Sequence, residues 1–240
     1  MIRLLFILCI TIYSFSQQQI TVVFNSNNTK LAKFELTYIR EILDIYTKEY
    51  DKNVKIKYQG IKDFKSNYTT LEAGKKNETL VINNVTITDE RKKQYDFSIP
   101  YIYNKYALLS RKDYFFRDSD TKKKVGFQTG GMSEQLSKEL PGEFPSERIG
   151  YSSMSMAVKA LDKREIEMIF NDYIGSWIYD LKVIRVFKPN LSNEFGIMYQ
   201  KGSKLKAPID AIMEKYHKSD KFKKLINKHF GEYAKTFFKL

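Results

Sequence analysis

The sequence predicts an α/β protein made of two successive α/β units. Two observations predict this class: short buried strands alternate with amphipathic helices, and a second series of strands and helices follows the first. The length of 240 residues suits two lobes of about 100 residues each. Hydrophobic residues make up 42% of the chain, which is enough to bury a core.

The N-terminal residues 1–17 are expected to be a cleaved signal peptide and to lie outside the fold. Arg3 supplies a positive charge, and the apolar stretch 4–15 is too short to span a membrane. Ser16 provides a small residue at the cleavage site. Cys9, the only cysteine, lies in this segment, so the mature chain is expected to have neither a disulfide nor thiol chemistry. A membrane anchor or a buried strand is the alternative.

The net charge of +13 comes from lysines that are scattered along the chain. No zinc-binding spacing or nucleic-acid-binding motif accompanies them, so a solvated basic surface is favoured and no nucleic-acid partner is predicted. Such a surface can still attract anions or anionic lipid. His217 and His229 lie in a basic helical pattern and have no metal-ligand spacing. We predict neither a metal site nor a cofactor.

The first unit follows the order strand, helix, strand, helix, strand. Phe34, Tyr38 and Ile42 recur at helical spacing, and Gly74 is a suitable helix stop. The predicted elements are a strand at 20–24, a helix at 30–50, a strand at 54–58, a helix at 64–73 and a strand at 80–82. This order predicts a mainly parallel sheet.

The second unit repeats the alternation. Its predicted strands are 106–110, 125–127, 167–170, 183–187 and 195–199, and its predicted helices are 133–140, 156–161 and 177–181. A turn is expected at Gly130 and Gly131. From Lys204 onward, lysines alternate with apolar residues at helical spacing, so this tail is available to pack on the first unit.

The densest motif is the segment 85–101. It reads Thr-Ile-Thr-Asp-Glu-Arg from Thr86 and Asp-Phe-Ser-Ile-Pro-Tyr from Asp96. This segment resembles the signature of the family 3 extracellular solute-binding proteins, the amino-acid-binding components of importers. Further similar segments extend over most of the chain: Leu71 to Gly74, Val125 to Gly130, Leu161 with Ile166 to Asp172, Phe195 to Ser203, and Lys221 to Gly231.

The resemblance implies an α/β type II periplasmic-binding-protein fold, with two α/β lobes joined by two crossing hinge segments. Lobe 1 is expected at 18–104 and 204–240, and lobe 2 at 105–203, with crossings near Lys105 and Gly202. It further implies a monomeric periplasmic protein, secreted with a cleaved signal peptide. That protein captures a small zwitterionic ligand, such as an amino acid or small carboxylate, for a membrane ABC permease or a sensor.

Three residues are expected to hold the two charged ends of the ligand. Arg91 matches the arginine that clamps the ligand carboxylate, and its planar fork suits bidentate binding. Thr86 matches a hydroxyl donor beside it. Asp172, at a strand end in the second lobe, matches the carboxylate that takes the ammonium. A surface salt bridge for Arg91 and a helix N-cap for Asp172 are the alternatives.

Four further residues are expected in the pocket. Asn83 and Asn84 match positions whose side chain and backbone contact the ligand, and Phe64 matches an aromatic that packs over the ligand side chain. Asn25 occupies a pocket position where relatives carry Asp in some cases. Phe64 could instead belong to the core, and the amides of Asn83 and Asn84 could instead satisfy local backbone groups.

The Gly130 turn departs from the family pattern. A hydroxyl residue usually follows it, but Gly131 and Met132 stand there, so only backbone N–H groups remain for the ligand carboxylate. An enzyme is not predicted. The alternatives are an orphan sensory domain and a cyclohexadienyl-dehydratase-like enzyme, for which Glu134 and Glu167 are the nearby acids without a convincing constellation.

Overall fold

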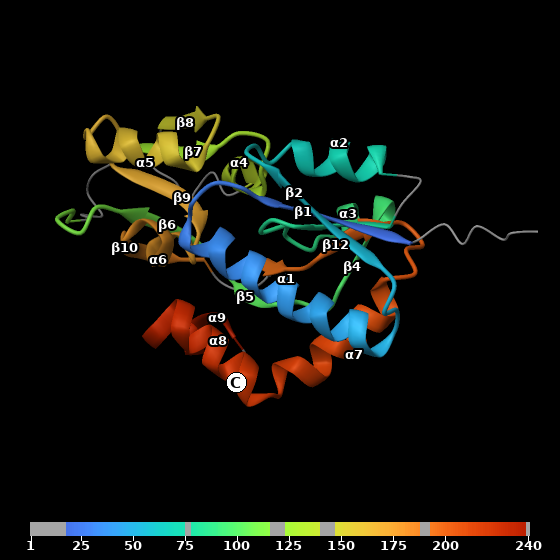
Figure 1. The fold of residues 1–240 in the computed structure, drawn as a ribbon. Helices are drawn as coiled ribbons and strands as arrows, with labels where there is room; N and C mark the ends of the chain where they lie inside the picture. The colour runs from blue at the N-terminus through green and yellow to red at the C-terminus, as the bar shows by residue number, and fades with distance from the viewer. Residues whose placement is uncertain (1–17, 75–77, 116–122, 140–146, 188–192, 239–240) are drawn as a thin grey trace, which may run out of the picture.

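A computed structural model of the chain describes residues 18–74, 78–115, 123–139, 147–187 and 193–238 (Figure 1). The expected signal peptide at 1–17 lies outside the described residues. Within these ranges, none of the helices has the length and apolarity needed to cross a bilayer. The same part of the chain holds no group of three or more His, Cys, Asp or Glu side chains suited to a metal ion.

The first lobe is built on a mixed sheet whose described strands lie in the order β2-β1-β3-β12-β4. These strands are β1 (Gln19–Asn25), β2 (Lys55–Ile61), β3 (Glu78–Ile82), β4 (Tyr95–Phe97) and β12 (Met198–Gln200). β2 and β3 run parallel to β1, whereas β12 is antiparallel to β3 and β4. Because parallel strands end at one edge of a sheet, Asn25 at the end of β1 and Asn83 directly after β3 emerge side by side.

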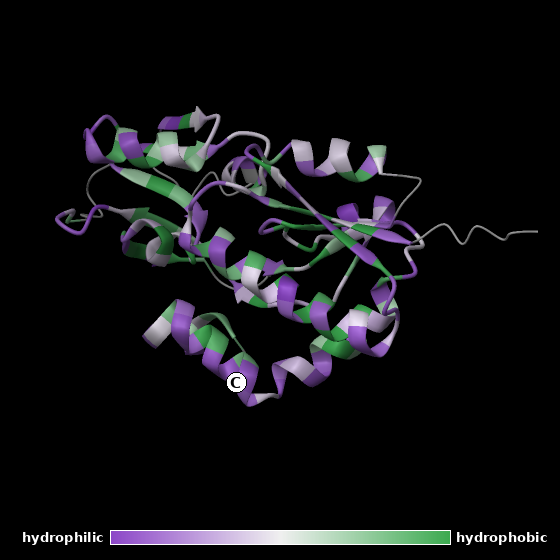
Figure 2. Ribbon diagram, in the orientation of Figure 1, coloured by the Kyte–Doolittle hydropathy of each residue, from purple (hydrophilic) through white to green (hydrophobic). Residues whose placement is uncertain are grey.

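The helices of this lobe include the C-terminal tail. They are α1 (Lys30–Glu49), α2 (Ser66–Ala73), α3 (Asp89–Gln94), α7 (Lys206–His217), α8 (Asp220–Phe230), the 3-10 turn η2 (Gly231–Tyr233) and α9 (Ala234–Phe237). The side chain of Thr29 caps α1 by accepting the N–H of Ala32 at 3.1 Å. Phe34 of α1 is fully buried, and its ring centroid lies 4.9 Å from that of Phe230. The tail therefore packs on α1, with hydrophilic residues outward (Figure 2).

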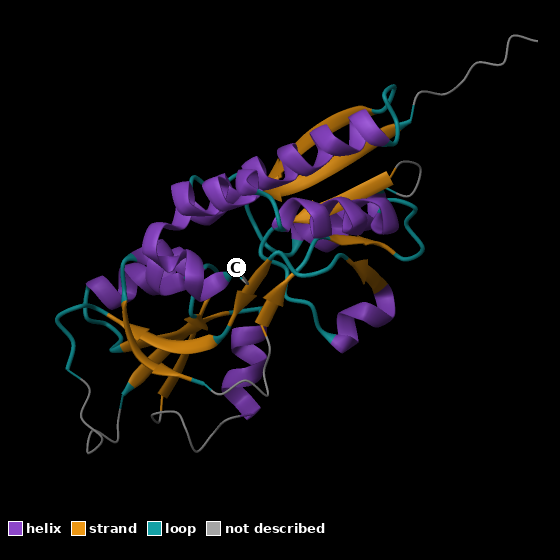
Figure 3. Cartoon of the chain, turned by 90° about the horizontal axis from the view of Figure 1, so that it is seen from below, coloured by secondary structure: helices purple, strands orange, loops and turns teal. Residues whose placement is uncertain are grey.

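The second lobe has its own sheet, with described strands in the order β10-β6-β9-β7-β8. Its elements are β6 (Tyr106–Ser110), β7 (Lys124–Gln128), α4 (Met132–Glu139), β8 (Glu147–Tyr151), α5 (Met154–Asp162), β9 (Met168–Asp172), α6 (Gly175–Tyr179) and β10 (Lys182–Val186). β7 is parallel to β8 and β9. Gln128 and Asp172 therefore end strands at the same edge. Figure 3 shows the two sheets as separate groups of strands.

Two crossing strands connect the lobes. β5 (Ile102–Asn104) and β11 (Asn193–Phe195) pair antiparallel in a two-stranded ribbon. β5 ends at Asn104, so the first crossing follows directly after it, in the region of Lys105. The second was predicted near Gly202, but β12 already pairs with β3 and β4 of the first sheet. We therefore correct the return crossing to Gly196 and end lobe 2 there instead of at 203.

Close packing at Gly196 explains why one predicted strand, 195–199, is two strands in different sheets. A Cβ on Gly196 would lie 2.7 Å from Cδ1 and 2.9 Å from Cγ1 of Ile87. The backbone can thus pass close to the segment before α3 only because residue 196 has no side chain. The chain leaves the ribbon at this point and enters the first sheet.

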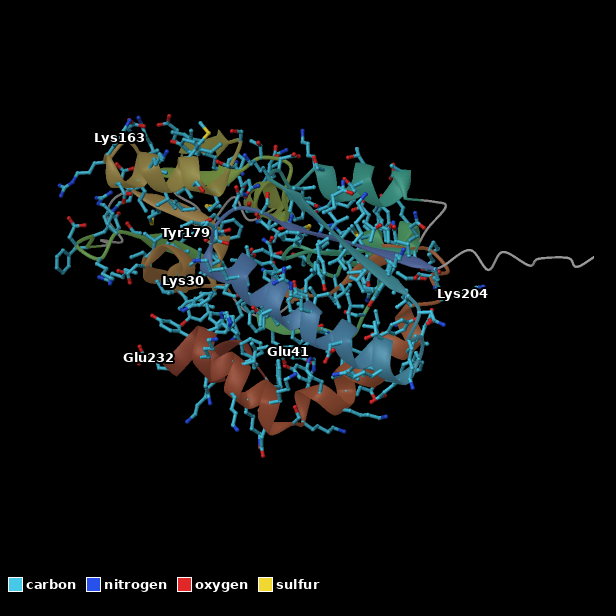
Figure 4. All side chains as sticks on the ribbon, in the orientation of Figure 1. Lys30, Glu41, Lys163, Tyr179, Lys204 and Glu232 are labelled. Atoms are coloured by element: carbon cyan, nitrogen blue, oxygen red, sulfur yellow. The ribbon has the colours of Figure 1, made fainter. Side chains whose placement is uncertain are left out.

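The lobes also touch away from the ribbon. Trp177 on α6 stacks on Phe230 of α8 with ring centroids 4.3 Å apart. Lys30 Nζ, at the start of α1, donates to the carbonyl oxygen of Trp177 at 3.2 Å and lies near its ring. Figure 4 shows Lys30 beside the α6 segment that ends at Tyr179. An apolar contact therefore joins a helix of lobe 2 to the helices of lobe 1.

Candidate functional site

The candidate site is a cleft between the two lobes, at the edges where the parallel strands end. All nine residues predicted for the site line this cleft: Asn25, Phe64, Asn83, Asn84, Thr86, Arg91, Gly131, Met132 and Asp172. The cleft encloses about 210 Å³, which suits one small molecule. In α/β sheets, ligands bind outside the carboxyl ends of the strands, and the geometry here follows that rule.

Arg91 enters the cleft from the first turn of α3. The side chain of Thr88 caps this short helix by accepting the N–H of Arg91 at 3.2 Å, which fixes the backbone at that position. Arg91 Nη1 donates to the carbonyl oxygen of Thr86 at 2.8 Å. The guanidinium carbon lies 5.7 Å from the ring centroid of Phe64 and 5.9 Å from that of Tyr68. These contacts hold the guanidinium plane against lobe 1, beside the cleft.

Asn193, which is not among the predicted site residues, connects the polar residues of the two lobes. This fully buried residue of β11 accepts a hydrogen bond from Thr86 Oγ1 at 2.9 Å through its Oδ1. Its Nδ2 donates to Asp172 Oδ1. The Thr86 hydroxyl, predicted to face the ligand beside Arg91, thus donates to Asn193. A continuous path of hydrogen bonds runs from Arg91 through Thr86 and Asn193 to Asp172.

Asp172 is a desolvated carboxylate at the end of β9. Burial raises its pKa from the usual 3.8 to about 6, while the Asn193 hydrogen bond and the charge of Arg91 lower it in part. Among the described residues, no hydrogen bond reaches Oδ2. Tyr106 lines the cleft nearby, and burial raises the pKa of its phenol. The Tyr106 hydroxyl is also buried without a hydrogen-bond partner in the described part of the chain.

The loop after β3 is fixed from behind by Glu35 of α1. Asn84 has a positive φ of 41°, a conformation that Asn tolerates better than most residues. Its N–H donates to Glu35 Oε1 at 2.7 Å, and Tyr101 Oη donates to the same oxygen at 2.5 Å. Burial raises the pKa of Glu35 from 4.5 to about 7. The amide of Asn83 donates to Asn67 Oδ1 at 3.0 Å.

The remaining predicted residues of lobe 1, Asn25 and Phe64, also line the cleft. Asn25 Oδ1 accepts the N–H of Asn27 at 2.8 Å, which shapes the loop after β1. Phe64 is half-buried and packs edge-on against Tyr68 with centroids 6.1 Å apart. Its ring therefore serves both the wall of the cleft and a small apolar cluster behind it.

The Gly130 turn differs from the expectation that its backbone N–H groups stay available. The N–H of Gly130 donates to Glu134 Oε2 at 2.7 Å, and this bond is the main reason why the pKa of Glu134 is lowered. A side chain of α4 thus takes one backbone donor of the turn. Gly131 and Met132 line the cleft directly after it.

One missed residue, Tyr106, and one missed helix, α3, carry signals in the sequence. Tyr106 starts a buried strand directly after the first crossing, and an aromatic hydroxyl there faces the space between the lobes. The helix that presents Arg91 was not predicted, although Thr88 followed by Asp89 and Glu90 is a typical N-terminal signal. Asn193 has no such signal, because its partners lie 107 and 21 residues away.

A comparison with protein families gives one match over most of the chain. The model of the bacterial extracellular solute-binding proteins, family 3, matches residues 14–232. The chain is 29% identical over 141 residues to the amino-acid-binding protein AabA of Dichelobacter nodosus, covering 58% of this chain and 53% of that protein. It is 28% identical over 101 residues to the ABC transporter arginine-binding protein 1 of Escherichia coli, covering 41% of each. The aligned part is thus about half of these relatives.

Solved structures extend the likeness to the whole fold. An ancestral arginine-binding protein bound to glutamine superposes with a TM-score of 0.66 at 26% identity. The superposition covers 89% of this chain and 97% of that chain. The predicted type II periplasmic-binding-protein fold is thereby confirmed.

Proposed function

The chain belongs to the bacterial extracellular solute-binding proteins of family 3, and from this premise we propose that it captures an amino acid between its lobes. One observation carries the proposal. A guanidinium from lobe 1 and a carboxylate from lobe 2, those of Arg91 and Asp172, line the same cleft. A zwitterion requires one cationic and one anionic partner, and Arg91 and Asp172 supply them from opposite walls of the cleft.

In the proposed complex, Arg91 holds the ligand carboxylate and Asp172 holds the ammonium through Oδ2. Both are charge-assisted hydrogen bonds, which are stronger than neutral ones. An open form can contact only one end of the ligand well. Closure is stabilised because the closed form contacts both ends at once, so ligand binding shifts the population toward it.

Asn193 acts as a positioning residue in this mechanism. Its amide donates to Asp172 Oδ1, which turns the second carboxylate oxygen toward the ligand. The same side chain accepts the hydroxyl of Thr86, whose carbonyl oxygen receives Arg91. Since Asn193 lies on a crossing strand, the two ligand anchors are aligned from the hinge.

The other cleft residues complete the binding surface. Phe64 packs over the aliphatic part of the ligand, and the loop at Asn83 and Asn84 forms the floor. Gly131 and Met132 offer backbone N–H groups to the ligand carboxylate from lobe 2. We include Asn25 as a contact for the ligand side chain.

The proposal extends to the cellular setting. The family is extracellular, and the two named relatives are binding proteins, one of them part of an ABC transporter. We propose that this chain is exported to the periplasm, acts as a monomer without enzymatic activity, and delivers its ligand to an ABC importer.

The test is the substitution Arg91→Ala. We expect the affinity for the amino acid that wild type binds tightest to fall by about 30-fold or more, since removing one partner of a buried charge pair costs about 2–5 kcal/mol. The thermal unfolding temperature should change little, because Arg91 is half-buried at the cleft wall. Isothermal titration calorimetry measures the affinity.

Lys92→Ala is the matched control. It removes one positive charge from the same helix, and its exposed side chain pairs only with Asp89 at 3.2 Å among the described residues. We expect this variant to bind as wild type does. Retention of affinity by Arg91→Ala, or an equal loss in Lys92→Ala, would refute the assigned role of Arg91.

A further inference from the structure

The charges on the walls of the cleft constrain the side chain of its ligand. Four charged residues of the described chain line the cleft: Lys62, Asp63, Arg91 and Asp172. In the proposed function, Arg91 and Asp172 are taken by the carboxylate and the ammonium of the ligand. Only Lys62 and Asp63, which are adjacent and opposite in charge, remain to meet a charged ligand side chain.

Neither of these two residues is a suitable counter-ion. Both are exposed at the rim, where water screens their charges. Asp63 is also occupied: its Oδ1 accepts the N–H of Ser66 at 2.9 Å and its Oδ2 accepts the Ser66 hydroxyl at 2.6 Å. These bonds lower the pKa of Asp63 and fix the start of α2.

A charged ligand side chain must therefore lose water without gaining a buried partner. The effective cost of desolvating an ion in a protein is several kcal/mol unless a well-placed opposite charge repays it. With Asp172 and Arg91 engaged by the main-chain groups of the ligand, a cationic side chain finds no second desolvated carboxylate in this cleft, and an acidic one faces only the exposed Lys62. The cleft disfavours both.

Amides and hydroxyls supply most of the other polar groups. Asn25, Gln128, Asn171, Ser155 and Tyr179 all line the cleft. An amide donates and accepts at once, and a hydroxyl does the same, so an uncharged polar ligand side chain can satisfy these groups when water is expelled. An apolar ligand offers these groups no hydrogen bond in place of the water that binding expels, which costs free energy.

We propose that the ligand is an amino acid with an uncharged polar side chain, of the amide or hydroxyl type, and that the cleft discriminates against cationic and anionic amino acids. This inference rests on the proposed function, because it assigns Arg91 and Asp172 to the main-chain groups of the ligand.

The experiment is a calorimetric panel on the wild-type chain. The probes are L-glutamine, L-asparagine and L-serine, compared with L-arginine, L-lysine, L-glutamate and L-leucine. We expect at least one uncharged polar amino acid to bind about tenfold or more tighter than every charged or apolar one, which corresponds to about 1.4 kcal/mol. Tightest binding of arginine, lysine, glutamate or leucine overturns this inference alone. Failure of every amino acid to bind overturns the proposed function.

A second experiment places a negative charge on the wall of the cleft. Asn25→Asp keeps the oxygen that accepts the Asn27 N–H, so the loop should fold as before. It also adds a half-buried carboxylate to the cleft wall. We expect the affinity for L-arginine relative to L-glutamine to rise about tenfold or more.

Asn28→Asp is the matched control, because Asn28 is an exposed residue of the same loop and does not line the cleft. We expect its order of preference to remain that of wild type. An unchanged order in Asn25→Asp, or the same gain in both variants, contradicts the inference.

Discussion

At the scale of single residues, Asp172 makes the proposed binding depend on pH. Its pKa is raised to about 6 by burial, and only the ionised form can accept the ligand ammonium. The affinity should be constant above this pH and fall about tenfold for each unit below it, since one proton must leave before the ligand binds. The ligand carboxylate stays ionised throughout this range, because the adjacent ammonium of a free amino acid lowers the carboxyl pKa below that of a chain terminus. Asp172→Asn should bind weakly and without this pH step, as calorimetry from pH 4 to 8 would reveal.

Asn193→Ala tests whether Asn193 positions Asp172. The readout is again the pH dependence of the ligand affinity. The Asn193 amide lowers the pKa of Asp172 by stabilising its charge, so removing the amide should raise the pKa further. We expect the midpoint of the affinity profile to move above about 6. A variant with weaker binding but an unmoved midpoint would show that Asn193 only fills space.

Glu35 gives a prediction about stability. Its pKa rises from 4.5 in the unfolded chain to about 7 in the fold, so the folded protein binds an additional proton in this interval. Its contribution is therefore most favourable below pH 4.5 and is lost as the pH rises through about 7, by about 3 kcal/mol at most. Glu35→Gln keeps an oxygen for the N–H of Asn84 and the hydroxyl of Tyr101.

The measurement is urea unfolding of both proteins from pH 4.5 to 8. We expect the free energy of unfolding of wild type to fall relative to that of Glu35→Gln as the pH rises. Because Asp172 and His217 titrate in both proteins, their contributions to the free energy of unfolding cancel in the difference between the two. A constant difference across this range would mean that folding does not raise the pKa of Glu35.

At the scale of the elements, α6 attaches lobe 2 to the tail helices of lobe 1. Trp177 is 7% exposed and stacks on Phe230. Trp177→Ala should lower the free energy of unfolding by about 3–5 kcal/mol, as large aromatic truncations in a core do. Trp177→Phe keeps a ring on Phe230 and should lose less. Denaturant unfolding of the three proteins measures their free energies of unfolding, which should decrease from wild type to Trp177→Phe to Trp177→Ala. Equal stability of Trp177→Ala and wild type would exclude this contact as a support of the fold.

The elements also show what the sequence can and cannot predict. The strands β1, β3, β6 and β9 and the helix α1 were predictable, because apolar spacing alone indicates each of them. β8 was missed because it is largely exposed and has few apolar residues. The split at Gly196 was missed because it depends on Ile87, more than 100 residues earlier in the chain.

The candidate site, too, has features that the sequence could predict and features that it could not. Arg91 and Asp172 were found because local motifs resemble those of the family. The hydrogen bonds of Thr86 and Asn84 were not, because each depends on a partner that the fold brings in from a distant part of the chain. Local pattern therefore predicted which residues face the cleft, while their actual partners required the structure.

At the scale of the whole molecule, the central claim is that the lobes close on a zwitterion held by Arg91 and Asp172. Spin labels at exposed Lys163 in lobe 2 and Lys204 in lobe 1, both labelled in Figure 4, report the distance across the molecule. Cys9 is the only cysteine, so the described part of the chain adds no competing thiol.

The most direct test is the distance distribution between labels on Lys163→Cys and Lys204→Cys, with and without the amino acid that wild type binds tightest. We predict that the ligand narrows the distribution and shifts it in the otherwise wild-type chain. When Arg91→Ala or Asp172→Asn is added to the labelled protein, the same ligand concentration should leave the distance distribution unchanged. An equal shift in either variant, or no shift in any of the proteins, would contradict closure on a zwitterion.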